Sequence, residues 1–180
     1  MRVCSVADCT DMLIQQNNGS DFFNRSWAEY KVGFGERSGS YWLGNDLLSQ
    51  LTANNRYKLK FDLQQNGTGT WYYAEYSTFR VLSEAGNYTL QVDGYSGNAG
   101  HDAFSLYQRH NGRQFSTFDR DNDGSSLFNC AARHGGAFWY GTCGGCFVNG
   151  ARGTGYFYWF NMLGGRAHDL EYSRMWLQCK

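Results

Sequence analysis

Three neighbouring segments, 57–63, 70–82 and 87–97, alternate apolar and polar residues with the two-residue period of a β-strand. In the first of them, Leu59 and Phe61 alternate with Lys58, Lys60 and Asp62. Successive side chains of a strand point to opposite faces, so one face of the sheet should be buried and the other solvated. Glycine-containing turns separate the segments. The pattern predicts an antiparallel β-meander.

The remaining segments predict short helices, a loop-rich half and a returning strand. Segments 25–35 and 45–55 have helical patterns, with Asn45 as the expected N-cap of the second. After residue 97 the periodicity fades and Gly, Asn and Asp dominate, until 170–179 returns as a strand. We therefore predict one α+β domain over residues 1–180. It comprises a reduced N-terminal segment (1–20), a central antiparallel sheet with short helices (21–97 and 170–179) and a loop-rich binding subdomain (98–169).

Charge and hydropathy exclude two classes of partner. The 16 basic and 16 acidic residues cancel, so no overall field attracts nucleic acid. No apolar run approaches the roughly 18 residues of a membrane span, and no signal peptide is visible. We therefore expect neither nucleic-acid binding nor membrane insertion.

Cysteines and glycosylation sequons indicate an extracellular protein. The chain has six cysteines, an even number that allows a full disulfide set. It also has four Asn-x-Ser/Thr sequons, which begin at Asn18, Asn24, Asn66 and Asn87. The alternative is a cytosolic protein with reduced thiols, but the two features together favour a secreted glycoprotein.

An acidic loop suggests a cation site. Asp119, Asp121 and Asp123 alternate, and Gly124 follows them. Hard cations such as calcium need several oxygen ligands, and carboxylates with this spacing can converge on one ion. The loop is not an EF-hand, because its twelfth position is Cys130 where an EF-hand has Glu. The alternative is an ordinary acidic turn that water satisfies.

Eight segments link the chain to a known family. In order they are SWAEYKVGFG, YWLGND, YAEYSTFRV, YTLQVDGYSGNAG, HNGRQFSTFDRDND, NCA, FWYGTC and VNG, and the resemblance that they carry covers about residues 22–178. In this order they resemble the fibrinogen C-terminal domain, which also occurs in ficolins and tachylectins. Residues 1–14 stand in place of most of the family's N-terminal subdomain. The resemblance implies a non-enzymatic, extracellular recognition module with one calcium ion beside a ligand pocket.

The resemblance also implies specific site residues. Calcium would be held by the side chains of Asp121 and Asp123 and by two backbone carbonyls before the next cysteine. Because the loop is one residue longer than usual, Ser125 and Leu127 are our candidates for the carbonyl donors. A Cys130–Cys143 disulfide would close the pocket loop, and a cis peptide would precede Cys143.

The chain departs from the family where ligand choice is decided. Acetyl-binding members have His directly after the second cysteine, where this chain has Gly144. A family Tyr is replaced by His134 beside Arg133, and a Tyr-Ala pair becomes Arg152-Gly153. A more cationic pocket suits a carboxylate, sulfate or sialic-acid ligand. The predicted ligand-binding set is Arg133, His134, Tyr140, Thr142, Cys143, Gly144, Arg152 and Tyr156.

The remaining cysteines leave alternatives open. Cys143 and Cys146 form a CxxC, which alone could be a redox pair or, with Cys130 and His134, a zinc site. No βαβ unit accompanies it, which disfavours the thioredoxin-type interpretation. If all six cysteines are bridged, Cys4, Cys9, Cys146 and Cys179 allow three pairings, of which Cys4–Cys9 with Cys146–Cys179 is the local one.

We therefore predict an extracellular, calcium-supported, lectin-like module for innate immune pattern recognition. Its partners would be glycans or acetylated or acidic ligands on cell surfaces. Such single sites are weak, so we also expect avidity through homo-oligomers, although these residues contain no coiled-coil or collagen-like stem. The alternative function is a protein–protein interaction module of the receptor-ligand, matrix or clotting type. The sequence contains no nucleophile–base–orienter set, so we do not expect an enzyme.

Overall fold

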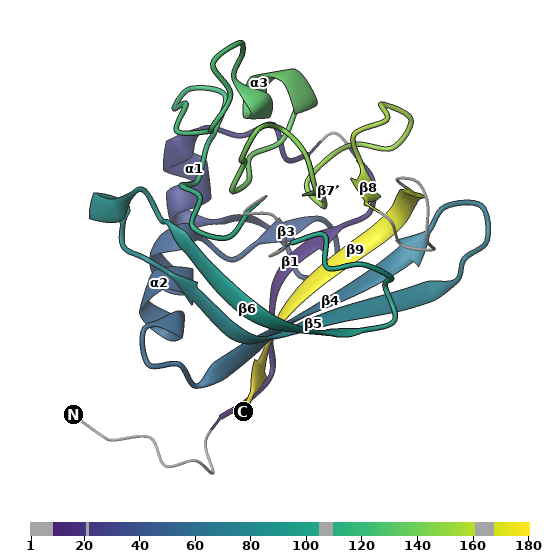
Figure 1. The fold of residues 1–180 in the computed structure, drawn as a ribbon, viewed down its shortest axis with the longest axis horizontal. Coiled ribbons are helices and arrows are strands. Elements are labelled where there is room, and N and C mark those ends of the chain that lie inside the picture. The colour runs from purple at the N-terminus through teal and green to yellow at the C-terminus, as the bar shows by residue number, and fades with distance from the viewer. Residues whose placement is uncertain (1–8, 21, 105–109, 161–167) are drawn as a thin grey trace.

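The computed structural model describes residues 9–20, 22–104, 110–160 and 168–180 (Figure 1). It confirms the α+β class with an antiparallel sheet. The main sheet has the strand order β2-β3-β1-β9-β4-β5-β6, and the short hairpin β7-β8 is attached through β9. The strands are β1 (Met12–Asn17), β2 (Phe34–Gly35), β3 (Tyr41–Trp42), β4 (Tyr57–Gln65), β5 (Trp71–Val81), β6 (Leu90–Gly97), β7 (Cys146–Phe147), β8 (Tyr158–Trp159) and β9 (His168–Cys179).

The predicted meander is confirmed by β4, β5 and β6, which pair antiparallel in that order. In β4 the side chains of Leu59, Phe61 and Leu63 are fully buried, whereas the alternating residues Lys60 and Asp62 keep partial exposure. The apolar residues therefore face the core and the charged residues face solvent, as the period of two requires.

Short helices lie beside the sheet, and α2 packs against β5. The helices are α1 (Trp27–Val32), α2 (Asn45–Thr52), the 3₁₀ turn η2 (Glu84–Gly86) and α3 (Cys130–His134). A capping box starts α1: Glu29 N–H donates to the Ser26 hydroxyl, and Ser26 N–H donates to the Glu29 carboxylate.

The expected N-cap role of Asn45 was wrong. The N-cap of α2 is Gly44, whose φ of 107° disfavours residues with a side chain. Asn45 is instead buried, and its Oδ1 accepts a hydrogen bond from the Trp42 indole N–H at 3.1 Å. A buried indole needs an acceptor, and this need decided the orientation of Asn45.

The strand β1 lies within residues 1–20, which the sequence predicts to be a reduced N-terminal segment. It pairs with β3 on one side and β9 on the other, and its residues Gln15 and Asn17 are fully buried. Their amide nitrogens donate buried hydrogen bonds: Gln15 Nε2 donates to Asn149 Oδ1 at 3.0 Å, and Asn17 Nδ2 donates to the Gly150 carbonyl at 2.7 Å. These buried bonds fix the turn at 148–150 against the sheet.

A disulfide joins Cys9, just before β1, to Cys179 at the end of β9. The predicted pairs Cys4–Cys9 and Cys146–Cys179 were therefore wrong, and Cys4 itself lies outside the described residues. The physical reason is the antiparallel pairing of β1 with β9, which brings the start of one strand beside the end of the other. The Cα atoms of Cys9 and Cys179 are 6.0 Å apart, within the usual span of a disulfide.

The loop-rich segment that contains α3 lies over one side of the sheet, away from the chain ends (Figure 1). No helix in the described ranges combines the length and the apolar character needed to cross a membrane.

Candidate ligand pocket and cation loop

The first of the three alternating acids, Asp119, is used by the fold. Its Oδ1 accepts hydrogen bonds from the backbone N–H of Trp27 at 2.9 Å and from the Thr117 hydroxyl at 2.7 Å. These bonds attach the acidic loop to the start of α1. Asp119 therefore has a structural role in the fold, and Asp121 and Asp123 are the two acids that the family pattern implies as cation ligands.

Asp123 organises the rest of the loop. Its Oδ1 accepts from Ser125 N–H and its Oδ2 accepts from Cys130 N–H, both at 2.7 Å. Burial raises the pKa of Asp123, the Cys130 and Ser125 amides partly offset the rise, and the nearby Asp121 carboxylate adds to it. Asp121 itself is exposed, and its Oδ1 accepts from Asp123 N–H at 3.2 Å.

The donor set of this loop fits a hard cation. A cation next to Asp121 and Asp123 would offset the burial and repulsion that raise the pKa of Asp123. Within the described ranges, the backbone carbonyls of Ser125 and Leu127 accept no hydrogen bond, so both are available as oxygen ligands. These four residues would hold calcium, which would neutralise the paired carboxylates and fix the loop.

The disulfide Cys130–Cys143 is present and joins α3 to the loop that follows Tyr140. The expected cis peptide before Cys143 was wrong, because every described peptide bond is trans. Cys143 instead adopts a left-handed φ of 56°, and the two glycines that follow it let the chain turn. Close to the disulfide, Gly124 N–H donates to the Gly141 carbonyl at 2.7 Å.

The CxxC cysteines have different surroundings. Cys143 is in the disulfide, so neither it nor Cys130 offers a thiolate to zinc. Cys146 is buried against His110: its Sγ lies 3.5 Å from His110 Nε2, which also accepts from Cys146 N–H at 3.1 Å. The other ring nitrogen, His110 Nδ1, lies 2.8 Å from the Trp139 carbonyl. The redox and zinc interpretations therefore receive no support.

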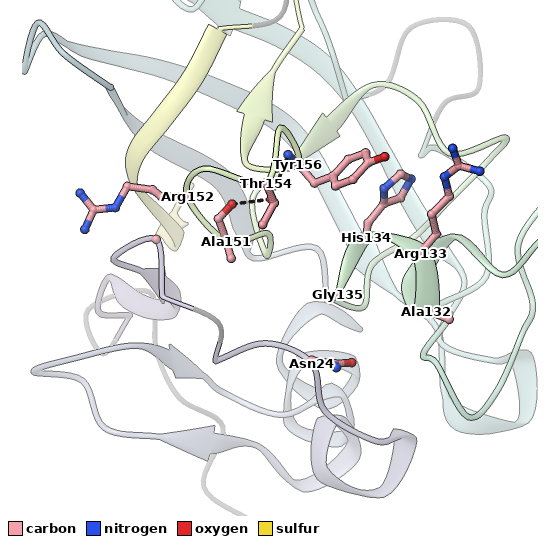
Figure 2. Close-up of a pocket in the computed structure, with 10 residues that line it drawn as sticks. Asn24, Ala132, Arg133, His134, Gly135, Ala151, Arg152, Thr154 and Tyr156 are labelled. Carbon is pink, nitrogen blue, oxygen red and sulfur yellow. Dashed lines mark hydrogen bonds between the residues drawn. The ribbon is translucent and has the colours of Figure 1, made fainter.

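A pocket of about 500 Å³ opens between α3, the 151–156 turn and the loop before α1 (Figure 2). Four predicted ligand-binding residues lie in it: Arg133, His134, Arg152 and Tyr156. The other residues that line it are Gly19, Asn24, Ala132, Gly135, Ala151 and Thr154. The pocket thus combines segments that lie more than a hundred residues apart in the sequence.

His134 forms an aromatic wall of this pocket. Its ring centroid lies 4.1 Å from that of Tyr156 and 4.4 Å from that of Phe147, and its side chain is only 7% exposed. Neither ring nitrogen has a hydrogen-bond partner among the described residues. Burial, with a smaller contribution from neighbouring Arg133, lowers the pKa of His134 to about 4. The residue is therefore neutral at physiological pH.

The two arginines lie at opposite rims of the pocket (Figure 2). Arg152 is ion-paired with Glu171, with 3.5 Å between Nη1 and Oε1. Arg133 has no carboxylate partner in the described part of the chain, and its guanidinium stacks 4.2 Å from the Phe128 ring centroid. Arg133 thus supplies the pocket's uncompensated positive charge.

The structure does not bring the whole predicted set together. Tyr140 is buried in the core and its hydroxyl donates to the Gly136 carbonyl, so it does not line the pocket. Its hydroxyl is satisfied internally, so its predicted ligand role stays a prediction that this pocket does not support. Thr142, Cys143 and Gly144 also lie outside the lining, beside the disulfide.

Gly19 and Asn24 line the pocket but are absent from the predicted ligand-binding set. Both lie in the connection between β1 and α1, far from α3 along the chain. The only local signal was the sequon at Asn24, which indicates a surface position and not a pocket wall. Their proximity to α3 depends on the buried β1 strand.

Comparison with known proteins identifies the family. Residues 6–176 match the model of the C-terminal globular domain of fibrinogen beta and gamma chains. Mouse tenascin is 38% identical over 174 residues, covering 93% of this chain and 8% of that protein. Human Ficolin-3 is 42% identical over 137 residues, covering 76% of this chain and 44% of that protein. The chain thus spans less than half the length of either relative.

Two solved structures have the same fold. The fibrinogen-like globe domain of human ANGPTL2 has a TM-score of 0.83 at 37% identity, covering 94% of this chain and 80% of that one. Lamprey fibrin D-dimer, complexed with the peptide Gly-His-Arg-Pro-amide, has a TM-score of 0.76 at 29% identity, covering 92% and 60%. Domains of this kind are non-enzymatic, extracellular binding modules that commonly bind calcium. The chain belongs to the fibrinogen C-terminal domain family.

Proposed function

We propose that the chain is an extracellular, calcium-supported, lectin-like module whose pocket binds anionic groups of cell-surface glycans in innate immune recognition. The observation that carries this proposal is Arg133, a guanidinium at the pocket rim without a carboxylate partner in the described residues. A guanidinium presents planar, paired donors that match a carboxylate or sulfate.

The other pocket residues support an anion that is attached to a larger group. His134 is neutral, so it adds an aromatic surface without charge, and Tyr156 adds a second ring beside it. Aromatic faces of this kind bind the apolar side of a ligand while the arginine binds its charge. Arg152 contributes less charge because Glu171 compensates it.

Arg133→Ala is expected to weaken binding of sialylated or sulfated glycans at least tenfold, because a hydrogen-bonded charge pair contributes about 1.5–3 kcal/mol. Arg133→Lys should bind with intermediate affinity, since it keeps the charge but loses the paired donors. Affinities would be measured by glycan array and calorimetry. Arg37→Ala, an exposed arginine outside the pocket lining, is the matched control. Equal binding by the Arg133 and Arg37 variants would contradict the proposal.

The proposed role of calcium is to hold the acidic loop and, through Cys130, the start of α3. Removing one carboxylate should therefore weaken calcium binding. Asp121→Asn is expected to raise the calcium dissociation constant at least tenfold from about 10⁻⁴–10⁻³ M, the range of extracellular modules. Asp93→Asn, an exposed acid on β6, is the control for surface charge. Titration calorimetry at constant ionic strength measures both, and unchanged affinity in Asp121→Asn would exclude this loop as the site.

The alternative is a protein-binding module, and one observation favours it. The acidic loop carries three exposed apolar side chains, Phe118 (46%), Leu127 (84%) and Phe128 (38%). The fibrin structure shows that a relative binds a peptide, but a cationic rim at Arg133 disfavours a chain-terminal amine. A glycan and peptide screen with and without calcium chelation separates the two functions. Calcium-independent protein binding that Leu127→Ser abolishes, without glycan binding, would establish the alternative.

A further inference from the structure

Among the described sequon asparagines, only Asn24 lines the pocket. It begins the sequon Asn24-Arg25-Ser26, and it lines the pocket from the wall that faces α3 (Figure 2). Its side chain is exposed and takes part in no hydrogen bond with a described residue. A sugar on its Nδ2 would therefore break no contact of the folded chain.

The backbone around Asn24 is held in place. Arg25 N–H donates to the Phe23 carbonyl at 2.9 Å, and the Arg25 side chain bonds to the Phe22 carbonyl and to Glu29. Ser26, the third residue of the sequon, is locked in the capping box of α1. A glycan on Asn24 would thus start from a fixed point at the pocket rim.

The other sequons provide internal contrasts. Both amide atoms of Asn87 are engaged, since Nδ2 donates to Gln114 Oε1 at 2.9 Å and Oδ1 accepts from Arg120 at 2.7 Å. A glycan there would replace one of the two Nδ2 hydrogens and crowd the contacts with Gln114 and Arg120. Asn66 is exposed on the turn between β4 and β5, outside the pocket lining. Asn18 uses its Oδ1 to accept from Ser20 N–H and the Ser40 hydroxyl.

We propose that Asn24 carries an N-linked glycan that narrows the pocket mouth and selects ligands by size. A branched glycan is bulky and hydrated, and it starts at one wall of a pocket of about 500 Å³. Small anionic groups would still reach Arg133, whereas polymeric ligands would be hindered. The size selection concerns the ligands of the proposed function, but the occupancy of Asn24 does not depend on it.

The first test is occupancy after secretion from eukaryotic cells. Glycopeptide mapping with enzymatic release in ¹⁸O water should show Asn24 occupied and Asn87 unoccupied. An unmodified Asn24 would overturn the proposal, whatever the pocket binds.

The second test measures access without relying on any ligand. Ala132→Cys places a thiol on the opposite wall of the pocket. Trimming the glycans to one sugar, or Asn24→Gln, should accelerate its labelling by a 5-kDa polyethylene glycol maleimide at least fivefold. Labelling by N-ethylmaleimide should change less than twofold. Thr78→Cys, exposed on β5, is the control and should respond to neither treatment.

Equal rates for the large reagent before and after trimming would overturn the size selection, even with Asn24 occupied. The access test could succeed while no anionic glycan binds either the glycosylated or the trimmed protein. That result would contradict the proposed function and leave the proposed glycan at Asn24 supported.

Discussion

Replacing Cys9 and Cys179 together by alanine is expected to lower the free energy of unfolding by about 2–5 kcal/mol. The disulfide joins residues 170 apart in sequence, so it restricts almost the whole unfolded chain. In the chain-entropy model the stabilisation grows with the length of the closed loop. Urea unfolding at pH 7 measures the change.

The second disulfide provides the comparison. Cys130 and Cys143 are 13 residues apart, and a loop of this size corresponds to about 3 kcal/mol in the same model. We therefore expect the Cys9→Ala/Cys179→Ala variant to be less stable than the Cys130→Ala/Cys143→Ala variant. The two should be compared in calcium-free buffer, because calcium bound to the acidic loop would add to the free energy of unfolding. A Cys9/Cys179 variant that unfolds at the wild-type urea concentration would show that pairing of β1 with β9 alone holds the ends.

Acidification is expected to destabilise the domain through His134. Its folded-state pKa is about 4, below the ordinary value of 6.5. Between these values the unfolded chain binds a proton that the folded chain does not, so stability falls as pH decreases from about 6.5 to 4. Above pH 6.5, neutral His134 makes its full contribution to the free energy of unfolding. At 1.36 kcal/mol per pKa unit, about 3 kcal/mol of that contribution is lost near pH 4.

His134→Phe should remove this dependence. Phenylalanine fits the aromatic surroundings of Phe147 and Tyr156, and it removes two buried nitrogens that lack described partners. The variant should also be more stable at pH 7, by about 1 kcal/mol or more. Unfolding curves between pH 4 and 8 measure both effects, with His101→Gln as an exposed control. A variant with the wild-type pH dependence would contradict the assignment.

Much of the sheet could be predicted because its signal is local. The alternation in 57–63 is confirmed by the structure, because strand geometry alone places Leu59 and Phe61 on the same face, which packs on the core. The strand β1 could not be predicted in this way, since its buried Gln15 and Asn17 are polar. Their partners Asn149 and Gly150 lie more than 130 residues away, and only the folded chain brings them together.

The site was predictable to a similar degree. The family resemblance indicated Asp121, Asp123 and the Cys130–Cys143 disulfide because these lie in one continuous motif. It also indicated Arg133 and His134 as pocket residues. It could not indicate that Tyr140 points into the core, where its hydroxyl donates to the Gly136 carbonyl, and not into the pocket. It also could not indicate Asn24, whose position depends on where the β1–α1 connection crosses α3.

The Cys9–Cys179 bridge also determines how the domain carries mechanical load. The described chain enters and leaves on the side opposite α3 and its loops (Figure 1). Tension between a segment before Cys9 and one after Cys179 would pass through the sulfur–sulfur bond, and the sheet would bear almost none of it. If the domain is part of a longer extracellular protein under tension, the pocket would keep its shape while neighbouring domains extend.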